Sequence, residues 1–257
     1  MTIIMSIVSP LGIIAASDSN VTRTDTDQAS SDPKVFPLGF TNGALALCGS
    51  YRTGNNERMD AWMPACIESY SRTDSPTQAG FAEYLKLRLE SDLSDAQKTS
   101  ANLYQIVGYV EDDDGIHPAL HFVRNAWSMN TATGAYEDIR PEFQVSEDFW
   151  QRDYPKDRLE ELVNPHWSRR YFNGTPDGRI AFAYFGELFQ QFLQAVWLQP
   201  SWKFRPPETL GELSSLVELQ IRAIGTLYEV SDYQAPFIGG DPQIYPISTP
   251  TGAVILE

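Results

Sequence analysis

Residues 1–20 read MTIIMSIVSPLGIIAASDSN, and this stretch decides the first part of the fold. Two short runs rich in isoleucine and valine, Ile3–Val8 and Ile13–Ser17, flank the tetrapeptide Ser-Pro-Leu-Gly. β-Branched residues favour strands, whereas proline and glycine favour turns, so the pattern predicts a β-hairpin. A secretory signal peptide is the alternative, but such a peptide has a positively charged start, and the first basic residue here is Arg23. The hairpin is therefore the favoured interpretation.

The composition is that of a globular protein with an acidic surface. The 257 residues are 42% apolar and carry a formal net charge of -15, which disfavours nucleic acids and anionic membranes as partners. The two cysteines and three histidines lack the spacing of a metal site, and no apolar run is long enough to span a bilayer. We expect a single cytoplasmic domain over residues 1–257, with an insertion-like region at about 125–175 and with neither a metal nor a cofactor.

The remaining elements alternate between strands and helices. A second hairpin is expected in residues 34–50, where Asn42-Gly43 provides a strong turn signal, and further strands in residues 102–127 and 237–256. Residues 19–33 are expected to form a polar loop, and residues 130–170 to contain short elements. Helical patterns occupy residues 54–73, 75–93, 178–199 and 207–232. This order favours an α+β fold with helices packed on the outer faces of two antiparallel sheets.

Three residues at regular spacing could together perform amide chemistry. Thr2 follows Met1, and removal of that methionine would leave an amine and a hydroxyl on one residue, so Thr2 could supply both nucleophile and base. Asp18 and Lys34 follow at successive intervals of sixteen residues. A lysine ammonium would lower the pKa of that amine and hydroxyl, and the carboxylate would orient the lysine. Taken singly, Asp18 could also be a solvated acid at a strand end, and Lys34 an exposed lysine at a strand start.

The turn of the first hairpin decides whether Thr2 and Asp18 lie on the same face. Side chains alternate along a strand, so a three-residue loop of Pro10, Leu11 and Gly12 places both on one face, and a two-residue turn places them on opposite faces. The three-residue loop is favoured, because a type I turn followed by a left-handed residue is common and Gly12 suits that last position.

This arrangement resembles the N-terminal-nucleophile hydrolases, and within them the proteasome β-subunits and their bacterial relatives. The threonine, aspartate and lysine have the same double spacing of sixteen, in the segments TIIMSIV, GIIAASDSN and KVF. The resemblance implies a four-layer αββα sandwich, hydrolysis of a peptide or amide substrate, and a homo-oligomeric assembly whose ring size the sequence does not give.

Two glycine-containing segments extend the resemblance. Gly49 in ALCGSYRTG matches the position whose backbone N–H helps to bind the oxyanion, and Cys48 is a nearby alternative. The segment PFIGGDPQIY is similar to the Gly-Gly segment that enters the late strands of the family. The chain departs from the family here, with Ala235 and Ile238 at the positions of an aspartate and a serine, and Asp232 lies too early to align.

The leading hypothesis is a threonine peptidase in which Thr2 attacks an amide carbonyl after removal of Met1. Asp18 and Lys34 would support the nucleophile, and the Gly49 N–H would bind the oxyanion. A catalytically inactive structural or assembly subunit is one alternative. An amidase or transpeptidase that uses the same acyl-enzyme is another.

Overall fold

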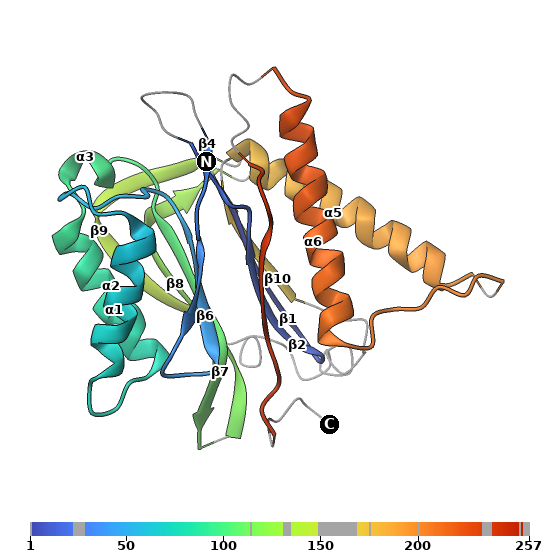
Figure 1. Cartoon of the computed structure of the whole chain (residues 1–257), viewed down its shortest axis with the longest axis horizontal. Coiled ribbons are helices and arrows are strands. Elements are labelled where there is room, and N and C mark those ends of the chain that lie inside the picture. Colours follow the sequence, from blue (N-terminus) through green and yellow to red (C-terminus); the bar gives the residue numbers. More distant parts are fainter. Residues whose placement is uncertain are drawn as a thin grey trace.

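The computed structural model describes residues 2–22, 29–113, 115–130, 135–148, 169–174, 176–199, 201–232, 238–251 and 253 (Figure 1). These residues form a mixed α and β structure with antiparallel sheets. Within them, no helix is long and apolar enough to cross a membrane. The two larger sheets and the helices packed on them determine where the residues singled out above lie.

The larger sheet has five strands in the order β5-β6-β7-β8-β9. Their bounds are β5 Val35–Leu38, β6 Gly43–Cys48, β7 Leu103–Asp112, β8 Gly115–Met129 and β9 Tyr136–Asp148. The second predicted hairpin is confirmed, because β5 and β6 pair from Val35↔Ala46 to Leu38↔Gly43. Leu45 and Leu47 of β6 are buried against the helices, whereas Ala44 belongs to a cluster that contains residues of the other sheet.

Helices α1 (Met59–Ser71) and α2 (Gln78–Asp92) cover one face of this sheet, followed by the short α3 (Asp95–Lys98) (Figure 1). The two longer helices confirm the predicted segments. The N-cap of α2 is Thr77, whose hydroxyl accepts a hydrogen bond from Gly80 N at 3.0 Å, so the helix begins slightly after Ser75-Pro76. Trp62, Phe81 and Leu85 anchor an apolar cluster between these helices and the sheet.

A second sheet contains the first hairpin and has four strands in the order β10-β1-β2-β11. Their bounds are β1 Ile3–Ser9, β2 Gly12–Ser17, β10 Arg169–Gly174 and β11 Gln243–Ile247. Helices α5 (Pro176–Trp197) and α6 (Leu210–Glu229) lie beside this sheet and confirm the last two predicted helices (Figure 1). Ile3, Met5 and Ile7 of β1 share an apolar cluster with residues of α6, whereas Val8 belongs to the cluster that includes Ala44.

The predicted three-residue loop of the first hairpin is wrong. Ser9 pairs with Gly12, which leaves Pro10 and Leu11 as a two-residue turn. The physical reason lies in the Ser9 side chain. Its hydroxyl donates to Gly12 O at 2.9 Å and accepts from Leu11 N at 3.2 Å, so it closes the shorter turn. Strict alternation in this register would place Thr2 and Asp18 on opposite faces.

Two other regions are more regular than expected. The predicted polar loop 19–33 contains β3 (Asn20–Thr22) and β4 (Ala29–Ser31), which pair as a two-stranded sheet. The segment expected to hold short elements contains β9, a strand of 13 residues paired with β8, and the start of β10, which pairs with β1. Charged and polar residues in these strands conceal the alternation that identifies a half-buried strand, which explains the difference.

Candidate active site

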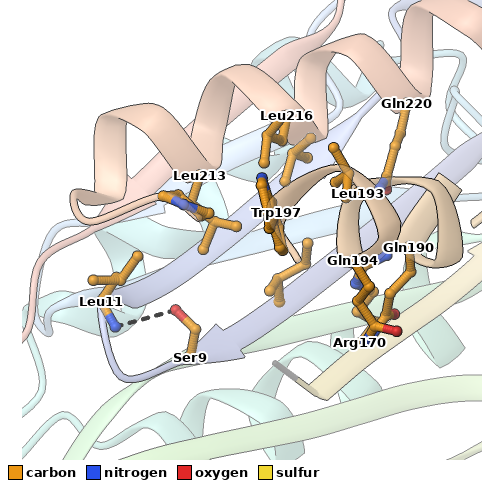
Figure 2. A pocket seen from close by; sticks show the side chains of 13 residues that line it. Ser9, Leu11, Arg170, Gln190, Leu193, Gln194, Trp197, Leu213, Leu216 and Gln220 are labelled. Carbon is orange, nitrogen blue, oxygen red and sulfur yellow. Dashed lines mark hydrogen bonds between the residues drawn. The ribbon is translucent and has the colours of Figure 1, made fainter. Parts of the chain in front are cut away.

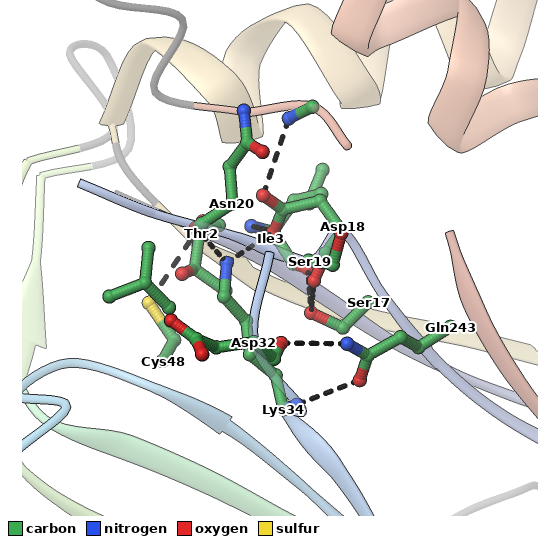
Figure 3. A network of polar contacts seen from close by, with 12 residues as sticks. Thr2, Ile3, Ser17, Asp18, Ser19, Asn20, Asp32, Lys34, Cys48 and Gln243 are labelled. Atoms are coloured by element: carbon green, nitrogen blue, oxygen red, sulfur yellow. Dashed lines mark hydrogen bonds and ion pairs between the residues drawn. The ribbon is translucent and has the colours of Figure 1, made fainter. Parts of the chain in front are cut away.

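Asp18 lies just beyond the end of β2 and is fully buried. Its Oδ1 accepts a hydrogen bond from Ile3 N at 2.9 Å, and its Oδ2 accepts one from Gly239 N at 3.3 Å (Figure 3). Asp18 N in turn donates to Ile3 O at 3.3 Å. The carboxylate thus takes the place that a main-chain carbonyl would occupy opposite Ile3, and this brings it to the nucleophile end of the hairpin in spite of the shorter turn.

Lys34 precedes β5 and is only 1% exposed. Its Nζ donates to Asp18 Oδ1 at 3.0 Å and to the carbonyl oxygen of Asn20. The contact expected between the lysine and the aspartate is therefore present, and the alternatives of a solvated acid and an exposed lysine are wrong. An ammonium has three N–H donors, so two are used within the described residues and one is left.

Burial and the ion pair shift the pKa values of Asp18 and Lys34 in opposite directions. Burial lowers the pKa of the Lys34 ammonium, and the Asp18 charge and hydrogen bond oppose that shift. Burial raises the pKa of the Asp18 carboxyl, and the Lys34 charge and the N–H groups of Ile3 and Gly239 oppose it. The ionised pair is held together by these hydrogen bonds, because two isolated charges would be costly at this depth.

Thr2 lies next to this pair through its own peptide bond. Asp18 Oδ1 binds both Lys34 Nζ and Ile3 N, and Ile3 N belongs to the peptide that joins Thr2 to Ile3. Thr2 is 6% exposed, and its carbonyl oxygen lies 3.9 Å from Cys48 Sγ. No direct hydrogen bond joins the Thr2 hydroxyl to Lys34 among the described residues. Met1 lies outside them.

Gly49 follows β6 and turns the chain with a φ of +142°, which side chains other than glycine rarely adopt. A Cβ at this position would lie 2.5 Å from Asn102 Oδ1, which accepts a hydrogen bond from Ser50 N at 2.8 Å. Gly49 is exposed, and within the described part of the chain its N–H has no acceptor. The structure thus places a free N–H one residue beyond Cys48, whose sulfur contacts Thr2.

Sequence reasoning missed two residues that position the pair. Gln243 of β11 accepts hydrogen bonds from Lys34 N at 2.7 Å and from Val35 N at 3.1 Å, and its Nε2 donates to Asp32 O at 2.7 Å (Figure 3). Nothing in the sequence pattern marks this glutamine, because its role depends on pairing between distant strands.

Gly239 is the second missed residue. It donates to Asp18 and accepts at its carbonyl from Ser19 N and Asn20 N, at 3.1 and 3.2 Å. A Cβ on Gly239 would lie 2.8 Å from Asn20 Nδ2, so only glycine allows this approach. The Gly-Gly segment was the available signal for it.

The departures from the family pattern have different outcomes. Ile238 is fully buried and packs in the cluster with α6, so it provides no hydroxyl near Asp18. Asp232 is exposed, and Ala235 lies outside the described residues.

Metal ligation and thiol chemistry have little basis in the observed geometry. Over the ranges that the structure describes, no group of three or more histidine, cysteine, aspartate or glutamate side chains could hold a metal ion. Cys48 and Cys66 are buried and form no disulfide, and burial raises the pKa of the Cys66 thiol to about 12. The candidate site is therefore the Asp18–Lys34 pair, which is bound to the peptide that joins Thr2 to Ile3.

Comparison with protein-family models gives no match, and comparison with curated proteins gives none either.

Proposed function

We propose that the protein is a threonine hydrolase that cleaves a peptide or another amide. Cleavage of the bond between Met1 and Thr2 would free the α-amine. The Thr2 Oγ1 then attacks the amide carbonyl, and its proton passes to the α-amine directly or through water. That proton goes on to the leaving amine, and water hydrolyses the resulting acyl-enzyme ester.

The observation that carries this proposal is the shared oxygen of Asp18. One carboxylate oxygen binds both Lys34 Nζ and the N–H next to Thr2, at 3.0 and 2.9 Å, in a fully buried setting. The remaining N–H of Lys34 is available to lower the pKa values of the Thr2 hydroxyl and amine. The Gly49 N–H supplies a donor for the oxyanion.

The fold supports the same proposal. Separate apolar clusters lie between α1, α2 and the five-stranded sheet, between α6 and the four-stranded sheet, and among residues of both sheets. We infer that these clusters are the interfaces of a four-layer αββα sandwich, the fold of the N-terminal-nucleophile hydrolases that the sequence resembles. The free, buried cysteines are compatible with a cytoplasmic setting.

A homo-oligomer is part of the proposal, and an exposed apolar surface supports it. On α5 the exposed large apolar side chains recur at intervals of four, and others follow after the helix: Tyr184, Leu188, Phe192, Leu198, Trp202 and Phe204. Such contiguous apolar surface favours burial against another molecule, and a second copy of the chain would provide it. Sedimentation velocity tests this directly, and a monomer at micromolar concentration would count against a compartmentalising protease.

Intact mass spectrometry with an electrophile that reacts with N-terminal threonine provides the test. We expect the wild type to lack Met1 and to gain the mass of one label, and the Thr2→Ala variant to remain unlabelled. Hydrolysis of a peptide library should be lost in the same variant. A protein that retains Met1, or one that takes no label and behaves like Thr2→Ala in every assay, would refute the hydrolase.

An inactive structural subunit is the second candidate, and a specific observation favours it. Ile238 occupies a position where the proteasome-like pattern has a serine, and its side chain is buried in an apolar cluster. The labelling experiment separates the two candidates, because an inactive subunit would keep the hairpin without a reactive Thr2. A transpeptidase would take the label and pass the acyl group to an amine instead of water, and an amidase would take the label and act on a small amide instead of a peptide.

A further inference from the structure

A pocket lies near the turn of the first hairpin, and Asp18 follows the other end of β2. It opens between β1, β10, α5 and α6 (Figure 2). Leu193, Trp197, Leu213, Leu216 and Val217 provide most of its apolar wall. A concave site of this kind, apolar with a few polar groups, is the usual form of a small-molecule site.

Arg170 supplies the only charged side chain that lines the pocket within the described residues. It extends from β10, where it pairs with Ile7 of β1. Its Nε is buried without a hydrogen-bond partner, and no described carboxylate forms an ion pair with it. Burial lowers the pKa of this guanidinium, but arginine stays protonated in proteins. The Nε–H of Arg170 is therefore enclosed without an acceptor among the described residues.

Gln220 of α6 is the second polar group without its partner. Its side chain lines the pocket and is 2% exposed, and its Oε1 has no hydrogen bond. Figure 2 shows Arg170 reaching in from the sheet and Gln220 from α6, with Gln190 and Gln194 of α5 between them in this view. Buried polar groups without partners are rare and costly, so two of them in one pocket point to a ligand.

We propose that this pocket binds a small organic carboxylate with an apolar body and an N–H or O–H donor. The carboxylate matches the planar fork of Arg170 and can form two parallel hydrogen bonds with it. The donor satisfies Gln220 Oε1, and the apolar body covers the leucine and tryptophan side chains. The site is independent of Thr2, because the residues that line it include none of the proposed catalytic residues.

Isothermal titration calorimetry with N-acetyl-L-leucine tests the proposal, since this compound combines a carboxylate, an N–H and an apolar side chain. We expect measurable binding to the wild type and at least tenfold weaker binding of N-acetyl-L-leucine amide, which lacks the charge. The Arg170→Met variant should bind the acid at least tenfold more weakly. The matched control Arg222→Met removes an exposed arginine outside the pocket and should bind the acid within twofold of the wild type.

Three outcomes would overturn the proposal. These are no binding of the acid at millimolar concentration, equal binding of the acid and its amide by the wild type, and unchanged binding of the acid by Arg170→Met. If Arg170→Met does not fold, as judged by circular dichroism, the comparison of acid and amide on the wild type decides alone. Because binding rather than turnover is measured, failure of the proposed hydrolase would leave this result unaffected.

Discussion

The first hairpin has a cation near each of its ends, and their surroundings differ: Lys34 is fully buried, whereas Arg170 is partly buried. At the open end, Lys34 donates to Asp18 and to the Asn20 carbonyl. At the turn end, Arg170 has no described carboxylate as a partner, and its buried Nε has no acceptor. The charge at the open end is paired within the chain, whereas the described chain provides no carboxylate for the charge at the turn end.

A cation that is paired within the chain and a cation that is not are suited to different roles. A balanced pair holds its groups in fixed positions and can tune the pKa of a neighbour, which suits a catalytic role. An arginine cannot lose its proton, so the cost of an enclosed N–H without an acceptor persists until a ligand supplies one. Two substitutions test the comparison. Asp18→Ala, which leaves Lys34 unpaired, should lower the free energy of unfolding, and Arg170→Met should raise it.

The largest effect is expected when the balanced pair is broken. Asp18→Ala leaves Lys34 buried without a counter-charge and should lower the free energy of unfolding by about 3–5 kcal/mol, as measured by urea denaturation. At alkaline pH the deficit should shrink, because a lysine can lose its proton. The double variant with Lys34→Met should recover much of the stability, since it removes the unpaired charge as well.

Asp241→Ala is the matched control for this change. Asp241 is 91% exposed, so its loss should change the free energy of unfolding by no more than about 0.5 kcal/mol. An Asp18→Ala protein within about 1 kcal/mol of the wild type would show that the pair does not balance a buried charge.

His121 of β8 adds a third case to the comparison, because a buried histidine can lose its proton and become neutral, whereas an arginine cannot. Burial lowers the pKa of His121 to about 4, from an ordinary value of about 6.5. Between these values the unfolded chain binds the proton and the folded protein does not, so stability falls as the pH falls. Acidification from pH 7 to pH 4 should cost about 3 kcal/mol through this group.

Urea denaturation of the wild type and of His121→Leu over this pH range measures that loss. Other groups titrate in both proteins, so the stability of the wild type relative to the variant is the quantity to follow, and it should decrease as the pH falls. Parallel pH profiles for the two proteins would mean that His121 accepts a proton in the folded state.

The open end of the hairpin was largely predictable from the sequence, because its signals are local. Strand-forming runs, turn residues and the regular spacing of Thr2, Asp18 and Lys34 all lie within the first 34 residues. The turn register was not predictable from the proline and glycine alone, since the hydroxyl of Ser9 selects the two-residue turn. Asp18 reaches its place through a side-chain hydrogen bond that strand alternation does not describe.

The turn end could not be predicted, because its residues meet only through long-range pairing. Arg170 lies in RRYFNG, where charged and polar residues suggest an exposed segment, and only the pairing of β10 with β1 buries it. Trp197 lies at the end of a segment whose pattern predicts only a helix, and it lines the pocket. Gln220 sits among apolar residues on the buried face of α6, so its helical pattern predicts burial without predicting a ligand.

The smallest effect, and the one of opposite sign, is expected at Arg170. Replacing it with methionine keeps much of the side-chain volume and removes an enclosed N–H that has no described acceptor, so the free energy of unfolding should rise by about 1–2 kcal/mol. Arg222→Met, at an exposed position, should change it by less than about 0.5 kcal/mol. Saturating N-acetyl-L-leucine should stabilise the wild type and should leave Arg170→Met unchanged, because binding to the folded state alone raises stability. If Arg170→Met is instead destabilised as strongly as Asp18→Ala, the arginine is balanced within the protein, and the contrast between the two ends of the hairpin does not hold.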